Sequence, residues 1–529
     1  MSGQGVFAGR SITIVDDLSL DEQLYLYRKT RQLKDALQRG DGIDEFTIYD
    51  ADLCVYLVFL EDSTRTKESF RNAAKFHGVR VNDFGAQNSS INKNESITDT
   101  IKMLFGYSDR SLFVIRSKME GVCRWLEAAI GDYGSRIGKA RPSFINAGDG
   151  KHEHPTQEFL DEFTFLEHRG WNREEIHLAL IGDLQHGRTA HSKSSGLKIF
   201  GSVRVDLVAP PELSIPNHYE EQMIANGFDV RKFASIEEYL ASNDVADIWY
   251  FTRLQLERMG DTILEKADEL RRSVTFAPKF LDRLRPGTRF YHPLPRHRAH
   301  PTIPSFLDQT ELNGWDLQSI NGYYTRIVEL SMVAGRLGSD FDGSHAVERT
   351  YVDDFVEEAP IRSDHTHEYK VGIKPVERGI VIDHIGRGRP IEKIWNQIDK
   401  IRHIMNLNCR SSHGVYHSNR PEVFKGIISL PDILSFDGTQ IKTLGAIAPG
   451  CTVNIVDDAR VHRKYRLHMP PRIYNFDDIS CKNEGCISFA AYHQHVRPEF
   501  VRSGDSTFAC RYCERPHEFG EIWDGLSVG

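Results

Sequence analysis

The sequence predicts an α/β protein in which two domains built on parallel sheets are followed by a linker and two smaller domains. Apolar runs of strand length alternate with helical patterns as far as about Leu337, and this alternation is typical of parallel sheets joined by helices. The composition then becomes polar and acidic over residues 338–368, which we interpret as the linker. Four of the eight cysteines lie in the last fifty residues, which indicates a separate terminal module.

The first domain is expected to begin with a helix. Ser19-Leu20-Asp21-Glu22 has the pattern of a capping box, which predicts a helix that runs to about Arg39. Periodicity then predicts alternating elements: a strand at Asp52–Leu60, a helix at Thr66–His77, a strand at Arg80–Phe84, a helix at Ser96–Gly106 and a strand at Ser111–Ile115.

A second alternating block starts near Phe144. Its expected strands are Ile176–Ile181, Arg204–Val208, Ala246–Tyr250 and Thr288–Tyr291, and its expected helices are Glu158–Glu167, Ser235–Ala241 and Gly322–Leu337. Beyond the linker, a third domain has expected strands at Gly379–Ile385, Ile401–Asn408 and Cys451–Val456.

The bulk composition excludes several classes of function. Lys and Arg number 66 against 75 Asp and Glu, a net charge of −9, which argues against a general nucleic-acid or anionic-membrane binder. No apolar run is long enough to span a bilayer, and residues 1–11 lack the apolar core of a signal peptide. We therefore expect a cytoplasmic protein with no nucleic-acid partner and no membrane partner.

The most informative motif is Ser63-Thr64-Arg65-Thr66, which stands between a predicted buried strand and a predicted helix. A helix start aims unpaired N–H groups and the positive end of its dipole at an anion. Three hydroxyls and a guanidinium add further donors at the same place. The motif therefore predicts a phosphate site, to which Arg116, at the end of another predicted strand, is expected to add a second guanidinium.

Four more motifs follow strands or open helices. They are His154-Pro155-Thr156-Gln157, Gly182 to Thr189, Thr252-Arg253-Leu254-Gln255 and His292-Pro293-Leu294-Pro295-Arg296. A histidine at a helix start has a lowered pKa and can donate a hydrogen bond as neutral imidazole. Arg253 and Gln255, two apart at a strand end, suit a carboxylate. Gly182 to Thr189 nearly matches a P-loop, but Arg188 replaces its lysine, which argues against a nucleotide triphosphatase.

The terminal cysteines have the spacing of a metal site. Cys481-x4-Cys486 and Cys510-x2-Cys513 supply four thiolates, which fit a tetrahedral structural Zn²⁺ with no open position for catalysis. We expect one such ion per chain and no catalytic cofactor.

The five motifs, in chain order over about Phe7 to Leu337, resemble those of the carbamoyltransferase family. The resemblance implies two doubly wound parallel-sheet domains. Residues 1–145 would bind carbamoyl phosphate and residues 146–337 the second substrate, with the last helix packing back on the first domain. The family's active sites are shared between neighbouring subunits, so a homotrimer or a higher homo-oligomer is implied.

The resemblance also implies roles for individual residues. Arg65, Thr66, His154 and Lys93 would be catalytic. Carbamoyl phosphate would be bound by Ser63, Thr64, Arg65, Thr66, Ser89, Lys93, Arg116, His154, Gln157, Pro293 and Leu294, with Ser89 and Lys93 reaching into the neighbouring subunit's site. Lys93, Arg188, Arg253 and Gln255 would bind the second substrate.

The choice of second substrate rests on three positions. Arg253 and Gln255 suit the β-carboxylate of L-aspartate, and Pro293 stands where the ornithine branch usually has cysteine. The chain therefore resembles the aspartate branch, which makes N-carbamoyl-L-aspartate for pyrimidine synthesis. A carbamoyltransferase of another amine, such as ornithine, and a non-catalytic scaffold fusion remain alternatives. Asn94, where the family usually has glycine, and His297-Arg298-Ala299-His300, where it commonly has Val-Asp-Glu-Ile, depart from its pattern.

Beyond the linker, the resemblance continues to the regulatory chain of the same enzyme. Residues 369–468 would form a nucleotide-binding-like α+β domain, and residues 469–529 a zinc-binding β domain. Asp383, His384, Lys425 and Lys464 stand where that chain binds nucleotide effectors, which makes ATP and CTP candidate ligands. Ala459 replaces an aromatic residue of the family there.

Overall fold

The computed structural model describes residues 5–85, 95–242, 244–255, 265–347, 352, 354–361, 376–417 and 423–523. The chain forms two compact units. The first comprises residues 1–348, 483–496 and 512–515, and the second comprises the rest. Two short segments from the C-terminal region therefore belong to the same compact unit as the N-terminal domains.

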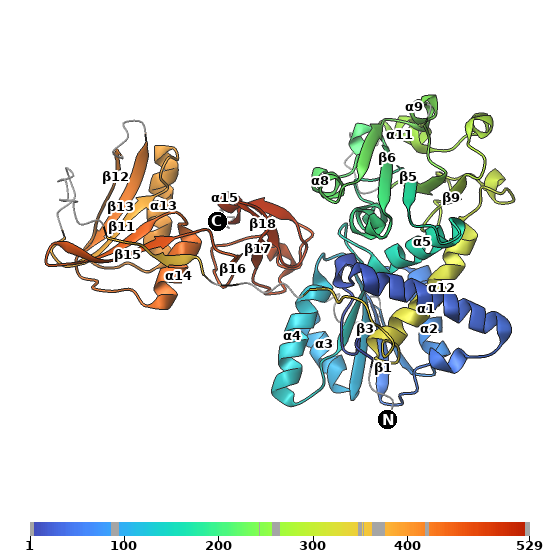
Figure 1. The fold of residues 1–529 in the computed structure, drawn as a ribbon, viewed down its shortest axis with the longest axis horizontal. Coiled ribbons are helices and arrows are strands. Elements are labelled where there is room, and N and C mark those ends of the chain that lie inside the picture. The colour runs from blue at the N-terminus through green and yellow to red at the C-terminus, as the bar shows by residue number, and fades with distance from the viewer. Residues whose placement is uncertain are drawn as a thin grey trace. The chain divides into compact units, whose positions relative to one another are not determined.

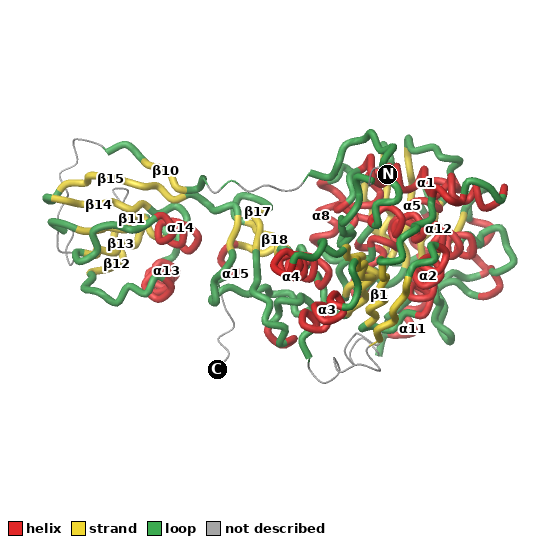
Figure 2. Tube along the Cα trace, turned by 90° about the horizontal axis from the view of Figure 1, so that it is seen from below, coloured by secondary structure: helices red, strands yellow, loops and turns green. Residues whose placement is uncertain are grey.

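The first sheet is parallel, as the alternating pattern predicts, with the order β2-β1-β3-β4 among the described residues. Its central strand β1 is buried at every position, because helices cover both faces: α3 and α4 on one side, and α1, α2 and α12 on the other (Figures 1 and 2). The elements are α1 (Leu20–Arg39), β1 (Leu53–Phe59), α2 (Thr64–Phe76), β2 (Arg80–Gly85), α3 (Ile97–Gly106), β3 (Arg110–Ser117), α4 (Val122–Ile137) and β4 (Ser143–Asp149).

Local signals set the ends of these helices. The predicted capping box at α1 is present: the Ser19 side chain accepts from the Glu22 N–H, and the Glu22 carboxylate accepts from the Ser19 N–H. After α2, Gly78 takes φ +68°, a left-handed conformation that favours glycine.

The position between residues 145 and 146, where we predict a domain boundary, lies inside β4, which pairs with β3 in the first sheet.

The second sheet is also parallel, with the order β7-β6-β5-β8-β9. Each expected strand of this block is present within a few residues of its predicted position. The elements are α5 (Pro155–His168), β5 (Glu175–Ile181), α6 (Arg188–His191), α7 (Lys193–Gly196), β6 (Ser202–Val208), α8 (Asn217–Ala225), β7 (Asp229–Phe233), α9 (Ile236–Ala241), β8 (Ile248–Phe251), α11 (Ala267–Val274) and β9 (Arg289–Tyr291).

A long helix returns from the second sheet to the first. This is α12 (Trp315–Val333), which begins seven residues before the predicted helix at Gly322 and packs against α1, α2 and α5. Its buried side chains, such as Ile327, Val328 and Leu330, join one apolar core that extends through both sheets. The two domains are therefore held by a common core.

The second unit contains two antiparallel sheets, of order β10-β15-β14-β11-β13-β12 and β16-β17-β18-β19. The elements are β10 (Val356–Glu358), β11 (Gly379–Ile385), α13 (Ile391–Ile404), β12 (Ser412–His417), β13 (Phe424–Leu430), α14 (Gly438–Ile447), β14 (Thr452–Asp457), β15 (Arg460–Leu467), β16 (Arg472–Ile473), β17 (Phe500–Arg502), β18 (Thr507–Cys510), β19 (Pro516–Glu518) and α15 (Phe519–Ile522).

One expected strand is wrong. Residues 401–408, predicted as a strand, contain the last turn of α13 and the loop that follows. Ile394, Ile398 and Ile401 are all buried at helical spacing, so the periodicity that begins upstream decides the structure of this segment. Among the described residues, no helix combines the length and apolar character that crossing a membrane requires.

Candidate active site and metal centre

A cavity of about 1080 Å³ opens where the strand ends of the two parallel sheets meet. Its walls include nearly every residue that the five motifs singled out and that the structure describes. They are Ser63, Thr64, Arg65, Thr66, Arg116, His154, Gln157, Arg188, Arg253, Gln255, Pro293 and Leu294. Ser89 and Lys93 lie outside the described residues, as does Asn94.

The predicted phosphate motif forms the first turn of α2. Ser63 is the N-cap residue, and Thr64, Arg65 and Thr66 begin the helix. The Arg65 Nη2 donates to Gln157 Oε1 at 3.0 Å, and its Nε has no partner among the described residues. Burial lowers the pKa of Arg65, so this guanidinium is placed where an anion would relieve its desolvation.

Glu61, to which the sequence analysis gave no role, links two basic residues of the cavity. Its Oε2 lies 2.7 Å from the Arg188 Nη2 and 3.3 Å from the Arg116 Nη2. Arg188 begins α6 in the second domain, and Arg116 lies on β3 in the first. One carboxylate thus joins guanidinium groups from both domains. Glu61 starts the same polar run as the phosphate motif, which was the available signal.

His154 is the N-cap residue of α5, with Pro155 in the first turn, as predicted. Its backbone N–H donates to Ser192 Oγ at 3.0 Å, and its Nε2 has no partner among the described residues. Its pKa lies well below 6.5, because the ring is buried and because Arg116, Arg188, Arg326 and Arg65 repel a proton there. The predicted direction is confirmed, but burial and arginines are the leading causes, where the sequence suggested the helix dipole.

The carboxylate-binding candidates follow β8. Gln255 is held by its backbone N–H, which donates to Asp183 Oδ2 at 3.1 Å, and by its Nε2, which donates to the His186 carbonyl at 3.2 Å. Arg253 is exposed to the cavity. Residues 297–300 form the segment whose sequence departs from the family's pattern. There, His297 Nδ1 accepts from the N–H groups of Ala299 and His300 at 3.2 and 3.0 Å, which makes a compact turn at the rim of the cavity.

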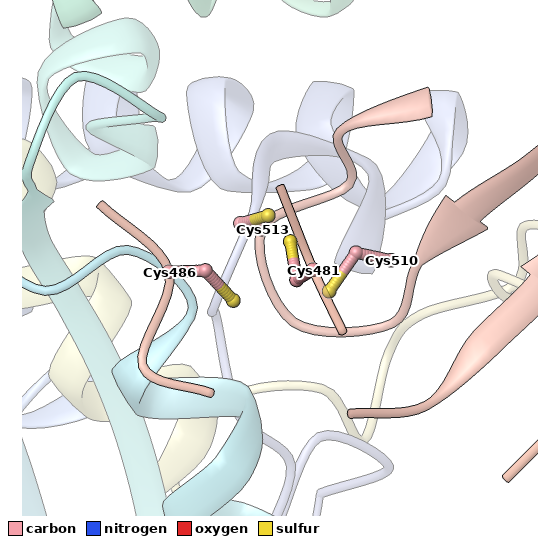
Figure 3. Close-up of side chains that lie close together, drawn as sticks. All are labelled: Cys481, Cys486, Cys510 and Cys513. Atoms are coloured by element: carbon pink, nitrogen blue, oxygen red, sulfur yellow. The ribbon is translucent and has the colours of Figure 1, made fainter. Parts of the chain in front are cut away.

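The four terminal cysteines converge, as their spacing predicts. All four are buried, none forms a disulfide, and their sulfurs lie within 4.8 Å of one another (Figure 3). Tetrahedral Zn–S bonds of about 2.3 Å place sulfurs about 3.8 Å apart, so this cluster fits a closed four-thiolate site. It can hold a structural metal ion.

The effector candidates gather on the six-stranded sheet. Lys425 Nζ donates to Asp383 Oδ2 at 2.8 Å, and His384 Nδ1 lies 3.2 Å from Thr452 Oγ1. Burial alone would raise the pKa of Asp383, but Lys425 and His384 lower it overall. Lys464 lies on β15, opposite Asn454. The structure therefore brings Asp383, His384 and Lys425 together, with the lysine already paired to a carboxylate.

Three family models match the chain. The model described as aspartate/ornithine carbamoyltransferase, carbamoyl-P binding domain, matches residues 10–167. Those described as the allosteric domain and the metal binding domain of the aspartate carbamoyltransferase regulatory chain match residues 371–468 and 471–523.

Two curated relatives match over nearly their whole length. Protein PyrBI of Thermotoga maritima is 54% identical over 528 residues, covering 98% of this chain and 99% of that one. Protein PyrBI of Treponema denticola is 53% identical over 527 residues, covering 98% of each. The chain belongs to the aspartate carbamoyltransferases, as a fusion of the catalytic chain with the regulatory chain.

Solved aspartate carbamoyltransferases have the same catalytic fold. The enzyme of Trypanosoma cruzi in complex with N-(phosphonacetyl)-L-aspartic acid is 28% identical, with a TM-score of 0.52, and the match covers 62% of this chain and 96% of that one. The catalytic subunit from M. jannaschii is 28% identical, with a TM-score of 0.51, over 61% and 96% of the two chains. The remainder of this chain is the regulatory part.

We predict that the His154 ring stays neutral across the working pH range. Its depressed pKa keeps the neutral imidazole fully present above 6.5, and protonation begins only at lower pH. In ¹⁵N-histidine NMR spectra, assigned by comparison with a His154→Gln chain, its ring signals should not move between pH 8 and about pH 6. A titration centred near 6.5 would contradict the account.

Proposed function

We propose that the cavity catalyses transfer of the carbamoyl group from carbamoyl phosphate to the α-amine of L-aspartate. One observation supports this most strongly: hydrogen-bond donors of Arg65, His154 and Arg188 line a single cavity, buried and without partners among the described residues. Unpaired buried donors are costly, and a phosphate, a polarised carbonyl and a carboxylate would satisfy all three. The Trypanosoma cruzi enzyme has been solved with carbamoyl phosphate and aspartate.

Carbamoyl phosphate would lie at the first domain's strand ends. Ser63, Thr64, Thr66 and the N-terminus of α2 are suited to its phosphate, together with Arg65 and Arg116. The neutral His154 would donate its Nε2 hydrogen to the carbamoyl carbonyl, and Gln157 would accept from the carbamoyl NH2. As the amine attacks, the carbonyl oxygen gains negative charge, which Arg65, Thr66 and His154 are placed to stabilise.

L-Aspartate would be bound from the second domain. Arg188 suits the α-carboxylate, and Arg253 with Gln255 suits the β-carboxylate, since guanidinium groups bind carboxylates bidentately. Ser89 and Lys93 would complete the site from a neighbouring subunit, which calls for at least a trimer. Holding both substrates between two domains lowers the entropic part of the barrier. The reaction serves pyrimidine synthesis in the cytoplasm.

The regulatory part has two proposed ligands. Zn²⁺ would bind Cys481, Cys486, Cys510 and Cys513 and hold their two turns together. ATP or CTP would bind near Asp383, His384, Lys425 and Lys464. The partly buried pair of Lys425 with Asp383 means that a nucleotide phosphate would have to compete with a carboxylate for this lysine.

We expect product from carbamoyl phosphate with L-aspartate and none with L-ornithine, because Arg253 lines the cavity as a cation that repels the ornithine ammonium. The assay is chromatographic detection of the carbamoyl amino acid. An Arg65→Ala chain, expected to lose about 10²–10³-fold in kcat, shows that turnover comes from this cavity. Carbamoyl-ornithine as the main product, or no product with either amine, would refute the proposal.

Elemental analysis should find one zinc per chain. A Cys510→Ser chain should lose most of it, because a four-thiolate site cannot close with one ligand missing. Cys409, which lies outside the cluster, provides the matched control: Cys409→Ser should retain the full zinc content. Unchanged zinc in the Cys510→Ser chain would show that the ion is bound elsewhere.

A further inference from the structure

A buried carboxylate behind the cavity contacts two glutamines from different helices. Asp161 on α5 is 0% exposed, and its Oδ1 accepts from the Gln157 Nε2 at 2.8 Å and from the Gln318 Nε2 at 2.6 Å. Gln318 belongs to α12. The other oxygen, Oδ2, accepts from the Lys193 Nζ at 3.0 Å. Both oxygens of Asp161 therefore accept hydrogen bonds, and Oδ1 accepts two.

This arrangement fixes which way both amides point. A carboxylate paired with an ammonium is an acceptor only, so each glutamine must turn its NH2 toward Asp161. Each Oε1 then faces the opposite way. The Gln157 Oε1 accepts from the Arg65 Nη2 at 3.0 Å, and the Gln318 Oε1 accepts from the His292 backbone N–H at 2.9 Å. A glutamine amide by itself has no preference for which of its two ends, NH2 or oxygen, faces a given neighbour.

The two glutamine oxygens contact two different parts of the cavity lining. One part contains Arg65 and Gln157, and the other is the turn His292-Pro293-Leu294. On the proposed function, the carbamoyl NH2 lies between them and needs acceptors. Gln157 Oε1 has a second lone pair for it, and Pro293, which has no N–H, offers only a carbonyl. A reversed Gln157 would turn an NH2 group toward both the Arg65 guanidinium and the substrate NH2.

We propose that Asp161 is the positioning residue for carbamoyl recognition. It sets the amide orientation of Gln157 directly and holds the His292–Leu294 turn through Gln318. The inference rests on the proposed function, and it adds two residues that touch no substrate but decide whether the site presents acceptors or donors to the carbamoyl group.

A simpler role for Asp161 would be to neutralise Lys193. Glu158 already does so, since its Oε2 lies 2.5 Å from the Lys193 Nζ, and it contacts neither glutamine among the described hydrogen bonds. Glu158→Gln is therefore the matched control: it removes a buried carboxylate from the same helix and the same lysine but leaves both amides oriented.

The test compares two ligands in steady-state kinetics: the KM for carbamoyl phosphate and the inhibition constant for inorganic phosphate, which lacks the NH2 group. In Asp161→Asn, the single remaining oxygen can face either the glutamines or Lys193, but not both. The new NH2 group then points at the other partner, so that two hydrogen-bond donors face each other. The KM should rise about tenfold or more, while the phosphate constant should change less than about twofold. Glu158→Gln should leave the ratio of the two constants unchanged.

Three outcomes would overturn either the inference about Asp161 or the proposed role of Gln157. If Asp161→Asn weakens both ligands equally, or neither, Asp161 is only structural. If Gln157→Met leaves the carbamoyl phosphate KM unchanged, the proposed role of Gln157 itself fails. If Gln157→Met raises that KM and Asp161→Asn does not, only the present inference fails. Should Asp161→Asn not fold, Gln318→Met, which keeps the pair of Asp161 with Lys193, must raise the same ratio, or the inference is wrong.

Discussion

The arrangement of this catalytic part depends on one constraint: several guanidinium groups are partly or fully withdrawn from water around a single cavity. Arg65, Arg116, Arg188 and Arg326 all act on His154 strongly enough to lower its pKa. Cations held this close repel one another and lose hydration. Glu61, between Arg116 and Arg188, offsets part of this cost. On the proposed function, an anionic ligand would offset more of it, so the site suits phosphate and carboxylate groups.

Much of the fold and site was predictable because the informative residues stand at element ends. A strand followed by a helix start, as at Ser63–Thr66 or His154–Gln157, marks a ligand-binding edge in parallel α/β domains without any tertiary information. The cysteine cluster could be predicted equally well, because each pair of its ligands is closely spaced in the sequence. The parallel order of both sheets followed from the alternation of elements alone.

The missed features were those that depend on tertiary contacts. Asp161 and Gln318 sit inside helices, where a polar residue looks solvent-facing until the packing of α5 against α12 buries it. Glu61 was visible beside the phosphate motif, but its partners come from β3 and α6. The strand expected at residues 401–408 failed because a short apolar run does not reveal that it continues an amphipathic helix. The pairing of Lys425 with Asp383 likewise needed the sheet register.

The most direct test of the central claim is a crystal structure of the full chain with N-(phosphonacetyl)-L-aspartate, which combines a phosphonate, a carbonyl and two carboxylates. The account predicts the phosphonate against the first turn of α2 and Arg116, the carbonyl oxygen on His154 Nε2, and the carboxylates on Arg188 and Arg253. A bound analogue that left the Arg65, His154 and Arg188 donors without partners would contradict the view that this cavity is built around an anion.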